Sequence, residues 1–286
     1  HLYSKTDLRR DAGFSIFYMG INLGAMIAPI IVGTLGQNYN YHLGFSLAAI
    51  GMFFGLLQYV IQGRKTLDGV GTVAPNPLSQ EERKGFIRNL VIALIVIVAI
   101  FGGAQVTGHL TIDFFINTIS VLGILLPLYY FIKMLTSKDV TTDEKPKVWA
   151  YIPLFLAAII FWSLQEQGSS ILALFASERT QSTLFGMTIP ASWYQSLNPI
   201  FIFALTPVFV TLWTKLGNRQ PSTVVKFSLG LLFAGLSFLL MMLPGMLYGT
   251  SGKVSPLWLI GSFLIVVIAE LCLSPVGLSA TTKLAP

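Results

Sequence analysis

Charged residues are scarce in this sequence: Asp, Glu, Lys and Arg together make up 10% of its 286 positions. Soluble globular domains carry about 25% charged residues, so an ordinary soluble protein is excluded. Disorder is also excluded, because 54% of the residues are hydrophobic and the formal net charge is only +6. What remains is a membrane protein whose chain crosses the bilayer several times.

Cysteine is nearly absent, and the few histidines are not clustered. Cys272 is the single cysteine, which excludes an internal disulfide framework and a cysteine-rich metal site. The three histidines, at positions 1, 42 and 109, are scattered along the chain. The sequence contains no G-x-S-x-G, H-E-x-x-H or phosphate-binding-loop motif. We therefore expect neither an enzyme nor a bound metal or cofactor.

Long apolar stretches are abundant. A helix needs about 20 mostly apolar residues to cross the hydrocarbon core. Eight stretches qualify or nearly qualify, at residues 14–33, 43–60, 87–101, 114–132, 148–175, 193–213, 224–247 and 257–276. These runs do not alternate between apolar and polar residues, as the strands of a membrane barrel would. The sequence predicts an all-α, polytopic membrane protein with eight transmembrane helices.

The distribution of Lys and Arg predicts the orientation of these helices. If the eight stretches cross the membrane in turn, Arg179 and Lys253 fall on one side. Every other Lys and Arg falls on the opposite side. Basic residues concentrate on the cytoplasmic side, so we expect both ends of this segment in the cytoplasm of a multi-pass cell-membrane protein. The net positive charge then reflects topology, and the expected partner is the lipid bilayer, with no nucleic acid.

Two polar loops divide the chain. The first, at 64–82, contains Pro75 and Pro77 and is predicted to be a cytoplasmic linker. The second, at 137–146, is predicted to be a cytoplasmic loop. They separate a pair of helices at 1–63, a helical hairpin at 83–136 and four helices at 147–286. The chain begins in a polar segment and stops just after a span, so we expect it to be a piece of a longer protein.

Two acidic residues are predicted near the middle of the membrane, Glu166 and Glu270, by counting the helical rise from flanking charges. An acidic residue at the centre of a membrane helix costs about 2.5–3.5 kcal/mol on insertion scales, so we expect both side chains to face protein or a watery cavity. No Lys or Arg of this sequence is predicted at that depth. Each acid is either a neutral group in helix packing or part of a transport or binding site.

Other polar and aromatic residues in the spans are candidates for the same site. Glu166 belongs to a run of six non-apolar residues, Gln165–Ser170, part of which must line a cavity. Trp162 shares its helix face and either packs or contacts a substrate. Asn22 and Asn198 either bond neighbouring helices or line the cavity.

Glu178 lies at the predicted outer end of its span, beside Arg179. It forms either a surface pair with that arginine or a gate contact.

Four strings in the sequence resemble the proton-coupled oligopeptide transporter family of the major facilitator superfamily, and the resemblance covers essentially the whole chain. They look like the family's fifth, seventh, eighth and tenth core helices. The strings are Arg9–Phe17 with Gly20–Gly24, Phe161–Gly168, Ser196–Pro199, and Glu270 with Leu273–Ser279. Residues 83–136 look like the two helices inserted between the bundles of many bacterial members. Residues 1–63 and 147–286 would then end the N-terminal bundle and begin the C-terminal one.

This resemblance implies uptake of di- and tripeptides with protons, powered by the proton gradient without a cofactor. Asn22, Asn198 and Glu270 would hold the amino-terminal end of the peptide, with Trp162 as a further substrate-binding residue. Glu166 would pair with a lysine of the family's fourth helix and take part in proton coupling.

The resemblance also assigns a gate residue: Glu178 would form an extracellular salt bridge with an arginine of the second helix. The implied partners are di- and tripeptides, protons, the bilayer and the helices of the same protein that this chain lacks.

The sequence departs from the family pattern in two respects. The E-x-x-E-R-F-x-Y-Y motif of the family's first helix is absent, together with the first four and last two helices. Some relatives have an acid where this chain has Gln165. Two alternatives stay open: a related symporter for nitrate or another small solute, and a membrane fragment that does not transport.

Overall fold

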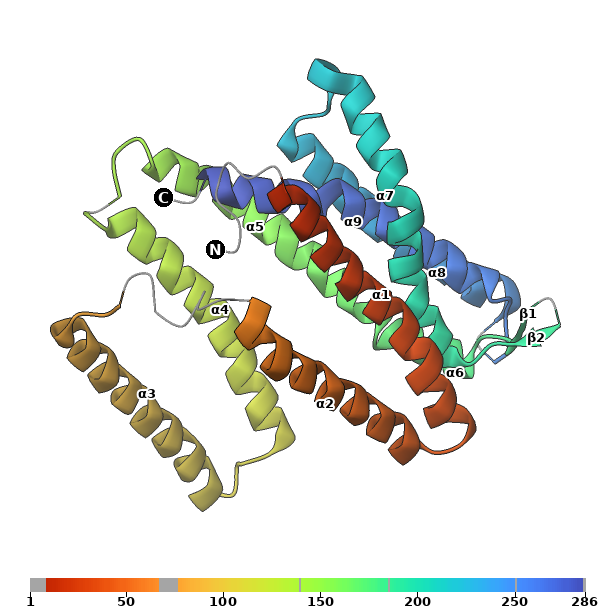
Figure 1. Cartoon of the computed structure of the whole chain (residues 1–286), viewed down its shortest axis with the longest axis horizontal. Helices are drawn as coiled ribbons and strands as arrows, with labels where there is room; N and C mark the ends of the chain where they lie inside the picture. The colour runs from red at the N-terminus through yellow and green to blue at the C-terminus, as the bar shows by residue number, and fades with distance from the viewer. Residues whose placement is uncertain (1–8, 67–76, 139, 185, 250, 285–286) are drawn as a thin grey trace. The chain divides into compact units, whose positions relative to one another are not determined.

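The computed structural model describes residues 9–66, 77–138, 140–184, 186–249 and 251–284 (Figure 1). Side-chain environments are described from residue 19 onward, apart from 64, 218, 274–276 and 278–284. Residues 67–76, which make up much of the predicted linker at 64–82, lie outside the described residues. Lys5, one of the basic residues used to predict the orientation, also lies outside them. The main helices are α1 (Arg9–Asn38), α2 (Tyr41–Thr66), α3 (Gln80–Val106), α4 (Ile112–Thr136), α5 (Lys145–Gln165), α6 (Ile171–Glu178), α7 (Leu197–Leu216), α8 (Thr223–Tyr248) and α9 (Leu257–Leu284).

Seven helical segments of the described chain are long and apolar enough to cross a membrane, and the apolar helix Leu257–Leu273 is somewhat shorter. All eight predicted stretches coincide with one of these segments. The prediction of an all-α, polytopic membrane protein is therefore confirmed. The seven longer segments bury little of their surface within the chain, as expected for helices that contact lipid or other helices.

The third helix is longer than the predicted stretch at 87–101. It begins at Gln80 because Ser79 caps it: the Ser79 hydroxyl accepts a hydrogen bond from the Glu82 amide at 3.2 Å, and the Glu82 carboxylate accepts one from the Ser79 amide at 2.9 Å. This reciprocal capping box satisfies two amides that a helix start leaves without partners. Counting apolar residues alone missed the polar first turn.

The predicted stretch at 148–175 is a broken helix. Between α5 and α6 lies the 3₁₀ segment η1 (Glu166–Gly168). The amide and hydroxyl of Ser169 both donate to the carbonyl of Glu166, at 3.2 and 2.9 Å, so the chain tightens to bonds between residues three apart. Serine side chains that bond nearby carbonyls compete with the regular helix. The polar run Gln165–Ser170 thus interrupts the span.

Short irregular segments follow the broken helix. Strands β1 (Thr183–Leu184) and β2 (Met187–Thr188) form a small antiparallel hairpin, which the sequence had not predicted. Gly186 has φ of +80°, a conformation that glycine adopts without the steric cost of a side chain. Two 3₁₀ segments, η2 (Ala191–Ser196) and η3 (Gly217–Arg219), flank α7.

The chain forms two compact units. One comprises Gln62–Lys145 and contains the α3–α4 hairpin, whose apolar side chains are mostly exposed. Within it, the Phe101 ring meets the Phe114 ring edge-on at 5.9 Å between centroids. The other unit contains the remaining described helices. The boundaries proposed from the sequence for five segments remain predictions.

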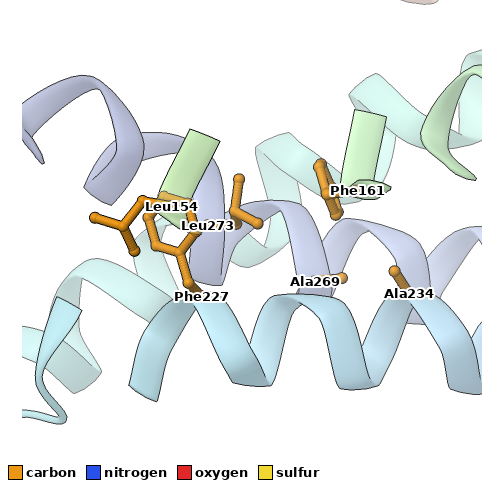
Figure 2. Packing of buried hydrophobic residues seen from close by; sticks show 6 residues of the cluster. All are labelled: Leu154, Phe161, Phe227, Ala234, Ala269 and Leu273. Carbon is orange, nitrogen blue, oxygen red and sulfur yellow. The ribbon is translucent and has the colours of Figure 1, made fainter. Parts of the chain in front are cut away.

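The core of the second unit lies along α8 and α9, which run side by side (Figure 1). Figure 2 shows its buried side chains, which come from α5, α8 and α9: Leu154, Phe161, Phe227, Ala234, Ala269 and Leu273. Gly230 of α8 permits the close approach, since a β-carbon there would lie 2.9 Å from the β-carbon of Leu273 and 3.1 Å from the carbonyl oxygen of Ala269. This packing fixes the position of Glu270, the residue after Ala269.

Candidate functional site

Glu270 of α9 is held by two side-chain amides from two other helices. Its Oε2 accepts a hydrogen bond from Nδ2 of Asn198 at 3.2 Å and another from Nε2 of Gln165 at 3.1 Å. Asn198 is the second residue of α7, and Gln165 is the last residue of α5. Three segments far apart in the sequence therefore meet at one partly buried carboxylate.

The arrangement leaves one carboxylate oxygen of Glu270 available. Both amides donate to Oε2, and within the described chain no hydrogen bond reaches Oε1. An ionised carboxylate accepts up to about four hydrogen bonds and binds ammonium and guanidinium groups strongly. Glu270 is thus an oriented acceptor with capacity for a cationic group.

Gln165 is a residue of this site that the sequence reasoning missed. Besides donating to Glu270, it keeps its own Oε1 buried without a hydrogen-bond partner among the described residues. A buried acceptor without a donor is costly. The available signal was its position at the start of the polar run, where the chain must face something other than lipid.

Asn22 lies on the helix that packs against the start of α7. Its side chain is buried, with 8% of its surface exposed. One turn further along α1, the carbonyl of Met26 accepts a hydrogen bond from the Ser196 hydroxyl at 2.7 Å. Asn198 follows Ser196 by two residues. The structure therefore brings the turn that carries Asn22 close to the segment that carries Asn198.

The expectation that Glu166 faces protein or a watery cavity stays a prediction. Its side chain is exposed within the described chain. The reason is the turn at η1, which directs Gln165 toward α9 and buries Gly168.

Trp162, one helical turn earlier, is 43% exposed and packs edge-on against Phe161 at 5.5 Å between ring centroids.

The predicted alternative of a surface pair between Glu178 and Arg179 is wrong. Nη2 of Arg179 instead donates to the carbonyl of Gly249 at 2.7 Å, and the backbone of Arg179 accepts from the Val254 amide at 2.8 Å. Both contacts turn Arg179 toward the loop after α8. The carboxylate of Glu178, at the end of α6, is exposed.

No group of three or more His, Cys, Asp or Glu side chains that could hold a metal ion is found among the described residues. The chemistry of the site rests on one carboxylate and its amide partners.

Comparison with known proteins shows close relatives. The family model described as "POT family" matches residues 1–286. The chain is 55% identical to the Uncharacterized transporter YclF of Bacillus subtilis, over 100% of this chain and 57% of that protein. It is 52% identical to the Di-/tripeptide transporter of Lactococcus lactis subsp. cremoris, over 100% of this chain and 59% of that one. The chain thus spans less than two thirds of these relatives.

Solved structures show the same architecture. A crystal structure of the peptide transporter POT in complex with sulfate matches with a TM-score of 0.94 and 53% identity, over 99% of this chain and 57% of that one. A POT family transporter in complex with 5-aminolevulinic acid matches with a TM-score of 0.92 and 46% identity, over 99% and 59%. These matches confirm the predicted all-α, polytopic helix bundle of major-facilitator type.

Proposed function

This chain belongs to the POT family, a family of transporters rather than enzymes, and from that membership we propose that it forms the core of a proton-coupled symporter for di- and tripeptides. Transport proceeds by alternating access across the cell membrane, and the proton gradient supplies the energy. Residues 1–63 end the N-terminal bundle, 83–136 are the inserted hairpin, and 147–286 begin the C-terminal bundle. The observation that carries the proposal is the amide-held carboxylate of Glu270.

Glu270 binds the peptide's terminal ammonium, assisted by Asn198 and Asn22. Support comes from Oε1 of Glu270, which accepts no hydrogen bond from the described residues, and from the hydrogen bond that orients its other oxygen. An ammonium has three donors and no acceptor, so it suits a site rich in oxygen. Gln165 adds a second oxygen at the same place. Trp162, on the same helix, lines the substrate path.

Glu166 carries the coupled proton and exchanges it as its pairing with a lysine of the family's fourth helix changes. Its position supports this role: Glu166 directly follows Gln165, which bonds Glu270. A change at Glu166 therefore reaches the peptide-binding carboxylate through one residue and one hydrogen bond.

At the outer end, the exposed Glu178 is the partner of an arginine of the second helix and helps to close the gate.

Uptake by the full-length protein in proteoliposomes tests this function. We expect a labelled dipeptide to accumulate when an inward proton gradient is imposed, and labelled nitrate not to accumulate. Glu270→Gln should weaken uptake of dipeptides with a free amine by at least about tenfold, because a charge-assisted contact is lost. N-acetylated dipeptides serve as the control and should change little. Equal losses for both peptides would argue against the ammonium role, and uptake of nitrate alone would replace the peptide assignment.

A further inference from the structure

The segment η2, between the β-hairpin and α7, is bound to α1 by three polar contacts. The indole Nε1 of Trp193 donates to the Thr34 hydroxyl at 2.8 Å. The Ser192 amide donates to the side-chain oxygen of Gln37 at 3.3 Å. The Ser196 hydroxyl makes the third contact, to the carbonyl of Met26. In addition, a side chain at Gly33 would collide with Ser192, so the backbones approach closely. We therefore expect η2 to follow α1 when α1 moves.

Gln195 connects the same segment to the broken helix. Its Nε2 donates to the carbonyl of Gly168, the last residue of η1, at 2.6 Å. An unbroken α-helix would satisfy this carbonyl from the amide of residue 172, four positions along. Here the side chain of Gln195 supplies the donor. In a membrane, a carbonyl without a donor costs several kcal/mol, so this hydrogen bond stabilises the break.

Gly168 also lies near α9. It is buried, and a β-carbon there would lie 3.5 Å from the ring of Phe263 on α9. The break thus lies near α9 and is bonded to η2, and Glu166 begins the same three-residue turn that Gly168 ends. Any displacement of Gly168 must change the geometry of this turn.

We propose that Gln195 is a positioning residue for proton coupling. It links α1, through η2, to the helix break that presents Glu166. This inference rests on the proposed transport function and adds a route by which movement of α1 reaches the proton carrier. Gln195 touches neither proton nor peptide; it acts by fixing the carbonyl of Gly168.

The test separates coupling from stability in the full-length protein. Gln195→Met keeps the length of the side chain and removes the donor. We expect it to lower proton-driven uptake about tenfold while peptide counterflow, which needs no net proton movement, stays within about twofold. Gln167→Met is the matched control. The Gln167 amide lies in the same break, but its contacts are local: it donates to the carbonyl of Ser163 at 3.1 Å and accepts from the Ser170 hydroxyl at 3.1 Å. It makes no contact with η2 among the described residues, so the ratio of the two activities should stay at the wild-type value.

Two further variants complete the test. Gln195→Asn retains an amide and should restore part of the coupling. Thr34→Val removes one of the three contacts between η2 and α1, and it should shift the same ratio in the same direction, by a smaller amount, even if Gln195→Met does not fold. An unchanged ratio in both Gln195→Met and Thr34→Val, or an equal loss of uptake and counterflow, would overturn the proposal. If the wild-type protein takes up no peptide, the transport function itself is wrong; if it does and only these ratios are unchanged, the inference alone fails.

Discussion

At the scale of single residues, the site shows how an acid is accommodated in an apolar span. Glu270 lies in a helix of apolar residues and costs about 2.5–3.5 kcal/mol in such a position. Two amide donors from α5 and α7 offset part of this cost, because hydrogen bonds to a charged group are stronger than neutral ones. The same bonds orient the carboxylate, so stability and recognition depend on the same side chains.

Asn198→Leu tests this orientation. The substitution keeps a similar volume and removes one donor from Glu270, so we expect affinity for dipeptides with a free amine to fall about tenfold. Competition against a labelled dipeptide measures the change. Thr206→Val, further along α7, is the control, since among the described residues the Thr206 hydroxyl bonds the carbonyl of Ile202 in its own helix. Unaltered affinity in Asn198→Leu would show that peptide binding does not depend on the Asn198 donor, with Gln165 still bonded to Glu270.

Tyr194→Phe should leave the protein as stable as the wild type, or make it more stable by up to about 1 kcal/mol. The Tyr194 side chain is 4% exposed and packs with Leu172, Leu259 and Phe263. Its hydroxyl is buried and has no hydrogen-bond partner among the described residues. Removing an unsatisfied polar atom recovers its desolvation penalty. Thermal unfolding in detergent measures the effect, with Tyr194→Ala as a control that should lose about 3–5 kcal/mol. A clear loss in Tyr194→Phe would reveal a bonded hydroxyl.

At the scale of elements, the broken helix and the α8–α9 pair have complementary roles. The break between α5 and α6 turns one side chain, Gln165, toward Glu270 and leaves the next, Glu166, exposed. The α8–α9 pair supplies the rigid surface against which that geometry is held, since Ala269 and Leu273 are buried on either side of Glu270. The site is therefore built on one irregular turn and one closely packed helix pair.

Gly230→Ala should destabilise this helix pair. The added methyl group would approach Leu273 to 2.9 Å and the Ala269 carbonyl to 3.1 Å, so the helices must separate. Overpacking of this kind costs about 1–3 kcal/mol, and we expect a lower midpoint of thermal unfolding in detergent.

Gly235→Ala is the matched control for that substitution. It lies on the same helix, and a β-carbon there meets no atom within 4 Å. Alanine is favoured over glycine in a helix by about 0.5–1 kcal/mol, so the control should be neutral or stabilising. If both variants behave alike, the close contact at Gly230 does not limit stability.

At the scale of the whole molecule, the sequence predicted the helices well and their connections less well. All eight stretches were found because apolar length is a local property of the sequence. The break after Gln165 was missed because apolar residues surround it on both sides. Gln165 itself was missed because its contact with Glu270 spans 105 residues and depends on how three helices pack. Asn198 and Glu270, which the structure joins by a hydrogen bond, were grouped because their strings resemble a known family.

The orientation of the chain in the membrane is a prediction that single-cysteine labelling can decide. Cys272 is the only cysteine and is buried, so Cys272→Ala provides a background in the full-length protein. Met187→Cys places a thiol on the β-hairpin, near Arg179, at a position 65% exposed. Leu78→Cys places one in the predicted cytoplasmic linker, between the basic pairs Arg64–Lys65 and Arg83–Lys84, at a position 58% exposed. Because basic loops are retained in the cytoplasm, a membrane-impermeant maleimide should label Met187→Cys in intact cells and Leu78→Cys only in inside-out vesicles. The reverse pattern would invert the topology, and with it the assignment of Glu178 to the outer gate.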